Sequence, residues 1–379
     1  MTRIAAPPLL TDPDLALARL LALLPALAPR RLAAGEAVGL VLAEALRLPG
    51  PVPPAPRALR DGWALEAAET LGAGPYAPAP LSRALAVASG EALPPGCDAV
   101  LDPFDITHLG PLRAALRDAI PGEGVRGAGE EAPEGFLLAG AGTRLRPLAL
   151  PLLAAAGIGR VAVRQPRLAL LPVGEEWMGG MADSLSPCLA ALALVEGAAC
   201  RLLPAVPDAP DAIAAALRGA AAEADLLCTL GGSGQGPSDH SAAGLDAAGA
   251  LLLHGIGARP GASAGFGQAG ATPVLLLPGR AEDALAAWLL LARPALRRLA
   301  QAAPPPRRRL RLARKLASSV GLAEIALLRR EGEAAIPLGL GSLTLAALAQ
   351  ADHALILPAA TEGHEEGAWI EAEPLWSPA

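Results

Sequence analysis

From Pro166 to about Ala303, short apolar runs alternate with helical segments, and this alternation limits the possible fold more than any other feature. The predicted strands are RLALLPV, CRLLPAV, DLLCTL and PVLLLPG, and the predicted helices are SLSPCLAALALVEG, PDAIAAALRGAAAEA and EDALAAWLLLARPALRRL. Such alternation is typical of a mostly parallel sheet with helices on both faces. Ligands of these sheets bind at the carboxyl ends of the strands. We therefore expect the functional loops after Val173, Leu230 and Leu277.

Two proline-rich breaks divide the rest of the chain. Apolar spacing over residues 14–46 predicts two helices, DLALARLLALLPAL and GEAVGLVLAEAL, before the break LPGPVPPAPR. Residues 57–124 consist of short segments between Pro and Gly, which is typical of a small β-rich domain. Residues 136–165 then predict a turn, a helix and a strand that rejoins the N-terminal helices. The second break, APPPRRR, isolates a β-rich tail over residues 307–379.

Composition excludes several classes of protein. A length of 379 residues suggests two to four domains, and aromatics at 2% mean that Ala, Leu and Val must fill the cores. The net charge of -6 argues against a nucleic-acid binder. Charged residues interrupt the apolar N-terminus and no other run is long enough for a membrane span, so we expect a cytoplasmic location without membrane contact. The four cysteines are widely spaced, which favours buried free thiols.

Three loops at predicted strand ends are candidate sites. The loop GGSGQGPSD, from Gly231 to Asp239, can bind an anion through its backbone N–H groups, or it is an ordinary turn. The loop GEEW, which contains Glu176, can hold Mg²⁺ or move a proton, or it is a solvated acidic turn. The loop LPGRAED opens a helix whose N-terminus can receive a phosphate, although its acidic residues serve equally well as a helix start.

Other motifs carry weaker indications. Asp61 follows the first proline break, where Asp and Gly most often form a turn, and a catalytic role is the alternative. The basic run RRRLRLARK, residues 307–315, fits the solvated face of an edge strand better than a site for an anionic partner. The match of GEGVRG to G-x-G-x-x-G lacks a preceding strand of a βαβ unit, so we interpret it as chance.

Seven segments in order resemble the molybdenum-insertase family, the MoeA proteins and the gephyrin E domain. RALRDGWAL is similar to S-x-M-D-G-Y-A, SGEALPPGCDAVL to T-G-x-x-L-P-x-G-A-D-A-V, and VRGAGEEAPEGFLLAGAG to V-R-x-x-G-E-D-x-x-x-G-x-x-L-L-x-x-G. PRLALLPVGEEW resembles the strand ending in G-D-E-L, and GGSGQGPSD resembles G-G-x-S-x-G-x-x-D. ARPGASAGFG with VLLLPGRAE resembles K-P-G-K-P-x-x-F-G with L-P-G-N-P, and LGSLTLAALAQADHALILPAATEGHEEGAWIE resembles the family's tail domain.

The resemblance implies an α/β multidomain fold and a homodimer whose cleft both protomers form. Its four implied regions are a discontinuous linker domain (1–51 and 125–165), an inserted β-rich domain (52–124), a molybdopterin-binding three-layer α/β domain (166–303) and a C-terminal β-barrel-like domain (304–379). It also implies a Mg²⁺-dependent transferase that inserts molybdate into adenylylated molybdopterin during molybdenum cofactor biosynthesis. Other cofactor-assembly proteins or molybdoenzymes are expected as partners.

Site residues follow from the resemblance motif by motif. Asp61, Glu176 and Asp239 take the catalytic positions, and Glu176, Asp239 and Glu131 the metal positions. The implied cofactor-binding residues are Gly231, Gly232, Ser233, Gly234, Gly236, Arg259, Pro260, Gly261, Pro278, Gly279, Ser89, Arg126 and Ser342. Such a site needs anion-binding amides, basic groups and carboxylates that place a cation and move protons.

The sequence departs from the family pattern in its ligand loops. The two lysines of K-P-G-K-P are replaced by Arg259 and Ala262, although Lys315 shows that the chain contains lysine elsewhere. Gly234 replaces the serine of the glycine-rich loop, and Arg280 and Ala281 replace the last residues of L-P-G-N-P. Two functions remain open: an active insertase in which Arg259 and Arg280 replace the lost groups, or a non-catalytic carrier, scaffold or regulator that binds molybdopterin. A third possible function is binding of another nucleotide by the α/β domain.

Overall fold

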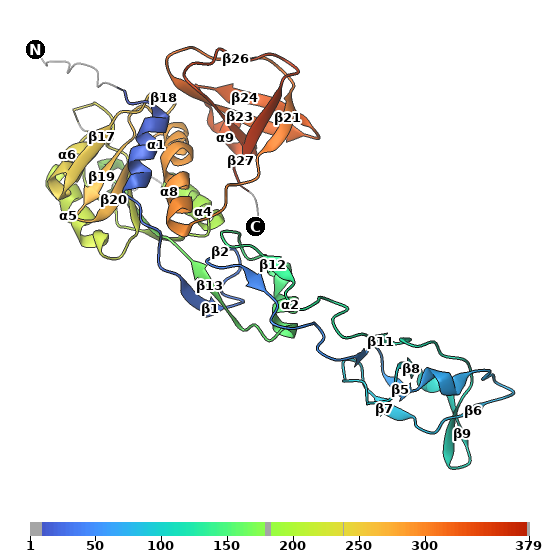
Figure 1. Cartoon of the computed structure of the whole chain (residues 1–379). Coiled ribbons are helices and arrows are strands. Elements are labelled where there is room, and N and C mark those ends of the chain that lie inside the picture. Colours follow the sequence, from blue (N-terminus) through green and yellow to red (C-terminus); the bar gives the residue numbers. More distant parts are fainter. Residues whose placement is uncertain (1–9, 179–182, 238, 377–379) are drawn as a thin grey trace, which may run out of the picture.

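The structure is a computed structural model that describes residues 10–178, 183–237 and 239–376. Figure 1 shows an elongated chain, with the α/β region and the C-terminal barrel at one end and the inserted region at the other. Residues 1–9 of the N-terminal stretch and Ser238 of the glycine-rich loop lie outside the described residues. Within these ranges, no helix has both the length and the apolar character needed to cross a membrane.

The α/β region forms one six-stranded sheet in the order β15-β14-β16-β20-β19-β17. The first four strands in this order are parallel, and the last two pair antiparallel, which confirms the predicted fold class. The strands are β14 (Arg167–Pro172), β15 (Ala199–Leu202), β16 (Leu226–Leu230), β17 (Ala250–His254), β19 (Gly265–Ala269) and β20 (Thr272–Leu277). The helices are α3 (Glu175–Met178), α4 (Leu185–Val195), α5 (Pro210–Ala221), α6 (Ser241–Ala248), α7 (Ala281–Ala287), η4 (Trp288–Ala292) and α8 (Arg293–Ala300).

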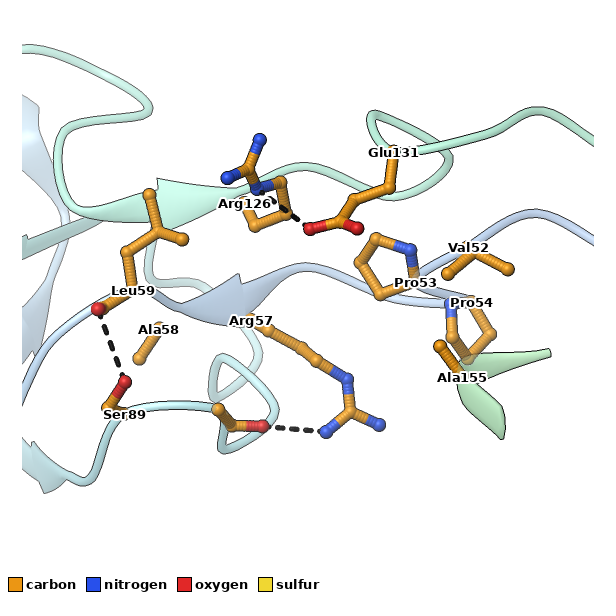
Figure 2. Close-up of a pocket in the computed structure, with 11 residues that line it drawn as sticks. Val52, Pro53, Pro54, Arg57, Ala58, Leu59, Ser89, Arg126, Glu131 and Ala155 are labelled. Atoms are coloured by element: carbon orange, nitrogen blue, oxygen red, sulfur yellow. Dashed lines mark hydrogen bonds and ion pairs between the residues drawn. The ribbon is translucent and has the colours of Figure 1, made fainter. Parts of the chain in front are cut away.

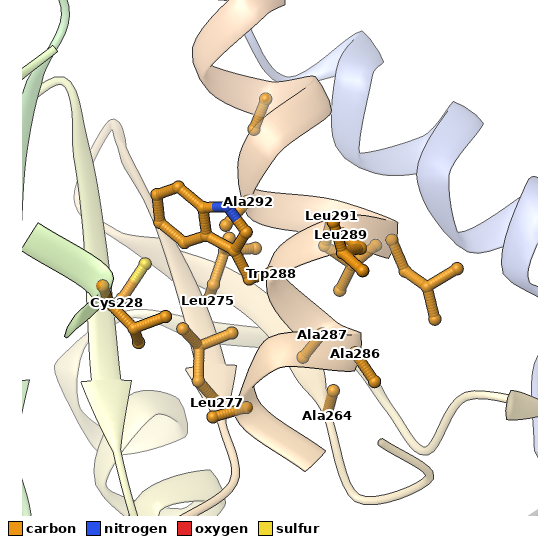
Figure 3. Packing of buried hydrophobic residues seen from close by; sticks show 14 of the residues in the cluster. Cys228, Ala264, Leu275, Leu277, Ala286, Ala287, Trp288, Leu289, Leu291 and Ala292 are labelled. Atoms are coloured by element: carbon orange, nitrogen blue, oxygen red, sulfur yellow. The ribbon is translucent and has the colours of Figure 1, made fainter. Parts of the chain in front are cut away.

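One large apolar cluster holds this region together. Trp288 is 1% exposed and lies against the sheet beside Cys228 and Leu275, as Figure 3 shows. Most of the other side chains in the cluster are Leu and Ala, as the low aromatic content predicts. Helix α1 (Pro13–Ala22), which the sequence places in the linker domain, buries Ala16 and Leu20 in this same cluster beside α8 and η4. The N-terminal helix is therefore part of the α/β packing.

The linker region contains strands where a second N-terminal helix is predicted. Its elements are β1 (Arg30–Ala33), β2 (Val41–Leu42), β3 (Leu46–Arg47), β12 (Leu137–Ala139), η3 (Pro147–Ala149), α2 (Leu150–Ala155) and β13 (Arg160–Arg164). The predicted helix over 35–46 is wrong because Gly39 adopts φ +79° and the following residues pair with β13 and with the Thr143 segment. The predicted helix and strand after Pro147 are confirmed, and β13 joins the N-terminal strands rather than N-terminal helices.

The inserted region is built from short strands, as predicted. They are β4 (Arg57–Ala58), β5 (Gly62–Leu65), β6 (Ala79–Pro80), β7 (Leu85–Val87), β8 (Ala99–Leu101), β9 (Ile106–Leu109), β10 (Leu112–Ala115) and β11 (Val125–Arg126), with η1 (Ala67–Thr70) and η2 (Pro103–Asp105). β5 lies between β7 and β8, and β10 between β6 and β9. Small apolar clusters, centred on Leu65 and Val100, support these sheets. The GEGVRG segment ends in β11 and forms no βαβ unit.

Five strands of the C-terminal region close into a barrel, because β23 pairs with both β24 and β25. The elements are β21 (Arg308–Leu312), β22 (Leu316–Ala317), β23 (Ala323–Glu331), β24 (Ala334–Leu340), α9 (Leu345–Gln350), β25 (His353–Leu357), β26 (Gly363–His364) and β27 (Trp369–Pro374). The predicted edge strand is wrong, since β21 lies between β24 and β27. Its alternation is nevertheless confirmed: Leu310 and Leu312 are buried, and Arg311 between them is exposed.

A buried ion cluster joins three regions of the chain. Glu196, at the end of α4 and 2% exposed, accepts hydrogen bonds from Arg144, Arg293 and Arg297 over 2.7–3.0 Å. Arg144 belongs to the linker region, and Arg293 and Arg297 belong to α8. The same two α8 arginines contact Glu373 of β27 at 2.9 and 2.6 Å. The Glu196 carboxylate thus connects the linker region to α8, and the Glu373 carboxylate connects α8 to the barrel.

The pKa of Glu196 shows that the arginines control its charge. Burial alone would raise the pKa of this carboxyl, but Arg297, Arg293 and Arg144 offset the effect, and the pKa lies below its ordinary value. Glu196 is therefore charged in the folded protein.

Replacement of Glu196 by glutamine should strongly destabilise the protein. The change removes the shared carboxylate of one buried and two partly buried arginines, and loss of one partner of a buried pair costs about 3–5 kcal/mol. Denaturant unfolding of the wild type and of Glu196→Gln measures the loss in unfolding free energy. The control is Glu44→Gln, which breaks the exposed pair with Arg31 and should change stability by less than about 1 kcal/mol. Equal effects of the two substitutions would contradict a central role for Glu196.

The difference between the wild type and Glu196→Gln should depend on pH in one direction. Since folding lowers the pKa of Glu196, its stabilisation is complete above the unfolded value of about 4.3 and disappears as pH falls through the folded value. The difference in unfolding free energy should be largest near neutral pH and shrink on acidification below about pH 4. Unfolding curves at several pH values measure it. A difference that is the same at every pH would show that the Glu196 charge contributes nothing.

Candidate functional site

The loops after Val173, Leu230 and Leu277 meet at one edge of the sheet, as the sequence predicts. The Val173 amide donates to the Leu230 carbonyl at 2.9 Å, and the Gly231 amide donates to the Leu277 carbonyl at 3.0 Å. Parallel strands place their carboxyl ends at the same edge, so these three loops face a common space. A Cβ on Gly279 would lie 3.3 Å from the Cα of Gly231, so glycine allows the second and third loops to approach each other closely.

Side chains of neighbouring elements fix the glycine-rich loop, Gly231 to Asp239, by hydrogen bonds to its backbone. Gly232 has φ +60°, and the Ser241 hydroxyl donates to the Gly231 carbonyl at 2.8 Å. His254 contacts the Ser233 carbonyl through Nε2 at 2.8 Å. Within the described residues, the amides of Gly232, Ser233 and Gly234 have no acceptor. Backbone donors of this kind are what an anion requires.

Three carboxylates surround this loop. Asp239 accepts from the Gly236 amide at 2.7 Å, and Glu176 of α3 folds back over Gly174. The third is Asp208, which follows β15 and which the sequence analysis missed. Its Oδ1 is buried without a hydrogen-bond partner in the described structure. Burial first, and then the charges of Glu176 and Asp239, raise the pKa of Asp208, while His240 opposes them. A carboxylate in such surroundings attracts a proton or a cation.

Asp208 has a signal in the sequence. The segment CRLLPAV is predicted as a strand, and the residues PDAPD that follow it stand before a predicted helix. The loop after this strand belongs to the same carboxyl edge as the three predicted loops, because β15 is parallel to β14. Applying the strand-end rule to all four strands would have identified Asp208.

A second pocket lies between the inserted and linker regions and contains three of the predicted residues, Ser89, Arg126 and Glu131. Figure 2 shows Arg126 directed towards Glu131, at 3.5 Å, on one side of the pocket. Ser89 lies opposite, and its amide donates to the predicted catalytic Asp61 at 2.8 Å. Arg57, which the sequence analysis did not select, also lines the pocket and donates to the Gly90 carbonyl at 2.6 Å. The pocket therefore has two guanidinium groups, one carboxylate and one hydroxyl.

A third pocket lies between the α/β region and the barrel. Strand β18 (Ala258–Arg259) pairs with β23 and brings Arg259 beside Ser342, as both line the pocket with Pro260, Gly261 and Ala262. Arg259 donates through Nε to Glu324 at 2.7 Å, and Glu324 is 1% exposed. Arg280 also lines the pocket and pairs with Glu282, and with Asp283 at 3.5 Å. Both cations proposed to replace the family's lost groups are therefore bound to carboxylates of this chain.

The predicted catalytic and metal residues fall into separate places within one chain. Glu131 lines the second pocket and Asp61 contacts its Ser89, whereas Glu176 and Asp239 belong to the sheet edge in the α/β region at the other end of the molecule (Figure 1). Among residues 10–178, 183–237 and 239–376, no three His, Cys, Asp or Glu side chains lie close enough together to hold a metal ion. One chain therefore does not bring the predicted carboxylates together.

Comparisons with known proteins match both halves of the chain. Residues 11–157 match the model of the MoeA N-terminal region (domain I and II), and residues 169–298 match that of a probable molybdopterin binding domain. The chain is 30% identical over 345 residues to molybdopterin molybdenumtransferase 1 of Mycobacterium tuberculosis, covering 79% of this chain and 80% of the relative. It is 24% identical to a putative molybdopterin biosynthesis protein of Methanocaldococcus jannaschii, covering 89% of each.

A solved structure extends the match to the fold of almost the whole chain. The molybdopterin biosynthesis MoeA protein of Pyrococcus horikoshii is 25% identical, with a TM-score of 0.74, and the match covers 97% of this chain and 100% of that chain. On the two regional matches, the mycobacterial relative and this fold, the chain belongs to the MoeA family of molybdopterin biosynthesis proteins.

Proposed function

We propose that this chain is a molybdopterin molybdenumtransferase that inserts molybdate into adenylylated molybdopterin. Its role in molybdenum cofactor biosynthesis follows from family membership, and the curated transferases among its relatives favour catalysis over the carrier function. The observation that carries the finer proposal is the sheet edge. There the amides of Gly232 to Gly234, which have no acceptor among the described residues, lie with the carboxylates of Glu176, Asp208 and Asp239. Amides suit a phosphoryl group, and carboxylates suit proton transfer.

The carboxylates at the sheet edge have the chemistry that Mg²⁺ requires, but within the described residues they do not form a three-ligand site by themselves. Carboxylate oxygens are the ligands that this hard cation prefers. The buried Oδ1 of Asp208 has no hydrogen-bond donor within the described residues, so a cation would stabilise it. We propose that Mg²⁺ enters with the phosphorylated substrate, whose oxygens supply most of its ligands, and that Asp208 adds one carboxylate while Glu176 and Asp239 contribute negative charge nearby. The bound cation would neutralise charge that develops on the phosphoryl oxygens. Asp208 takes the place of Glu131, which belongs to the second pocket.

We further propose that two copies of the chain complete the site. Asp61, Ser89 and Arg126 lie in the inserted region, far from the sheet edge of the same chain (Figure 1). A homodimer that places the second pocket of one protomer beside the sheet edge of its partner would unite all three predicted catalytic carboxylates. The proposed location is the cytoplasm, with other cofactor-assembly proteins or molybdoenzymes as partners.

Gly232→Asp should abolish molybdopterin binding. A Cβ at this position would lie 2.6 Å from Oδ1 of Asp208 and 2.8 Å from the Ser241 hydroxyl, and the new carboxylate would repel an anion. The matched control is Gly270→Asp, which has a similar φ of +63° and no heavy atom within 4 Å of a new Cβ. Calorimetric titration with molybdopterin measures binding. Absence of binding to the wild type, or equal binding by the two variants, would contradict the assigned site.

Asp61→Asn and Glu176→Gln should each lower the rate of cofactor formation by about 100-fold or more, as expected for loss of an acid-base group. If two chains share each site, a mixture that exchanges subunits should recover about a quarter of the wild-type rate, because half of the dimers then contain one intact site. Two assays measure the rate: the activity of a molybdoenzyme in an insertase-deficient strain that expresses the variant, and reconstitution of a molybdoenzyme with the purified protein. Full activity of either single variant would refute its catalytic role, and no recovery on mixing would refute the shared site.

A further inference from the structure

A fourth pocket lies outside the proposed active site. It is formed where the linker region, the end of α4 and the segment between α8 and β21 meet. Its polar lining consists of Thr143, Arg144, Arg146, Glu196, Arg293 and Arg297, and Pro304 to Pro306 form an apolar side. It shares no residue with the glycine-rich loop or with the second pocket.

The charges at this pocket do not balance. Arg144, Arg293 and Arg297 face the two carboxylates of Glu196 and Glu373, which leaves one positive charge in excess. The side chains of Arg293 and Arg297 are only 5% and 14% exposed, so bulk water screens this excess poorly. Arg146 adds a second positive charge at the rim. Two positive charges in a partly enclosed pocket favour a dianion.

Free hydrogen-bond donors accompany the excess charge. Arg293 and Arg297 are occupied by Glu196, Glu373 and the Pro374 carbonyl. Among the described residues, Arg144 in contrast donates only through Nη2, to Glu196. In the part of the chain that the structure describes, the Arg146 guanidinium makes no hydrogen bond or ion pair. Arg144 and Arg146 are two residues apart around buried Leu145, and both line the pocket. Two planar groups with free N–H donors match the oxygens of a tetrahedral anion.

We propose that this pocket binds a tetrahedral oxyanion of the phosphate class, held by Arg144 and Arg146. The anion neutralises the excess charge of the Glu196 cluster and adds a bond between the linker region and the junction of α8 with the barrel. Occupancy therefore stabilises the arrangement of these regions, and the ligand is either free phosphate or the phosphoryl group of a larger molecule such as a nucleotide.

The test measures phosphate binding to the full chain at constant ionic strength, with chloride as the balancing anion. Inorganic phosphate should raise the thermal unfolding midpoint of the wild type in a saturable way. Arg146→Ala should weaken the apparent affinity by about tenfold, the loss expected for a charge-assisted contact. This substitution removes no hydrogen bond or ion pair within the described residues and should leave folding intact. Arg298→Ala is the matched control, because this exposed arginine of α8 does not line the pocket.

Gly232→Asp separates this pocket from the sheet edge, where phosphate has a second place to bind. The phosphate effect should persist in Gly232→Asp and in Arg298→Ala. Loss of the whole effect in Gly232→Asp, or affinity in Arg146→Ala equal to that of the wild type, would overturn the proposal. A parallel titration with AMP distinguishes the two possible ligands. If AMP binds more tightly than phosphate and its binding depends on Arg146, the ligand is a nucleotide phosphoryl group. If AMP binds more weakly than phosphate, the ligand is the free anion.

Discussion

The interaction on which the arrangement of the chain depends is the contact of one buried carboxylate, Glu196, with three arginines. Apolar packing stabilises each region by itself, but it has no direction and does not orient one region against another. The Glu196 carboxylate accepts hydrogen bonds in defined directions from Arg144 of the linker region and from Arg293 and Arg297 of α8. Because the buried charges are costly when unpaired, this geometry is favoured over alternatives that separate them.

The parallel strands determine where the loops of the candidate site lie. Their register places four loops at one edge, and glycines at 231, 232 and 279 let the backbones approach closely enough to present free amides. Carboxylates that are up to 63 residues apart in sequence, from Glu176 to Asp239, then share an electrostatic environment, which the raised pKa of Asp208 reports.

Elements with strong patterns were predictable, and those that depend on pairing partners were not. The parallel strands β14, β15, β16 and β20 and the helices α4, α5, α7 and α8 follow from their apolar spacing, whereas α6 and the antiparallel strands β17 and β19 were not predicted. The alternation of Leu310 and Leu312 identified the exposed face of β21. Residues 35–46 have the spacing of a helix, yet they form turns and strands because β13, more than a hundred residues later, offers them backbone partners. The same limit applies to β21, whose neighbours on both sides come from later in the chain.

The sequence by itself determined the fold class, the family resemblance and the residue types of the site, because local spacing and ordered motifs encode them. Only the tertiary structure showed that Asp208 joins Glu176 and Asp239, and that Arg259 and Arg280 are already bound to carboxylates. It also showed that Asp61 lies at the other end of the molecule from the sheet edge. These facts concern which distant segments meet, and they are decided by burial and charge pairing across the whole chain rather than by any local pattern.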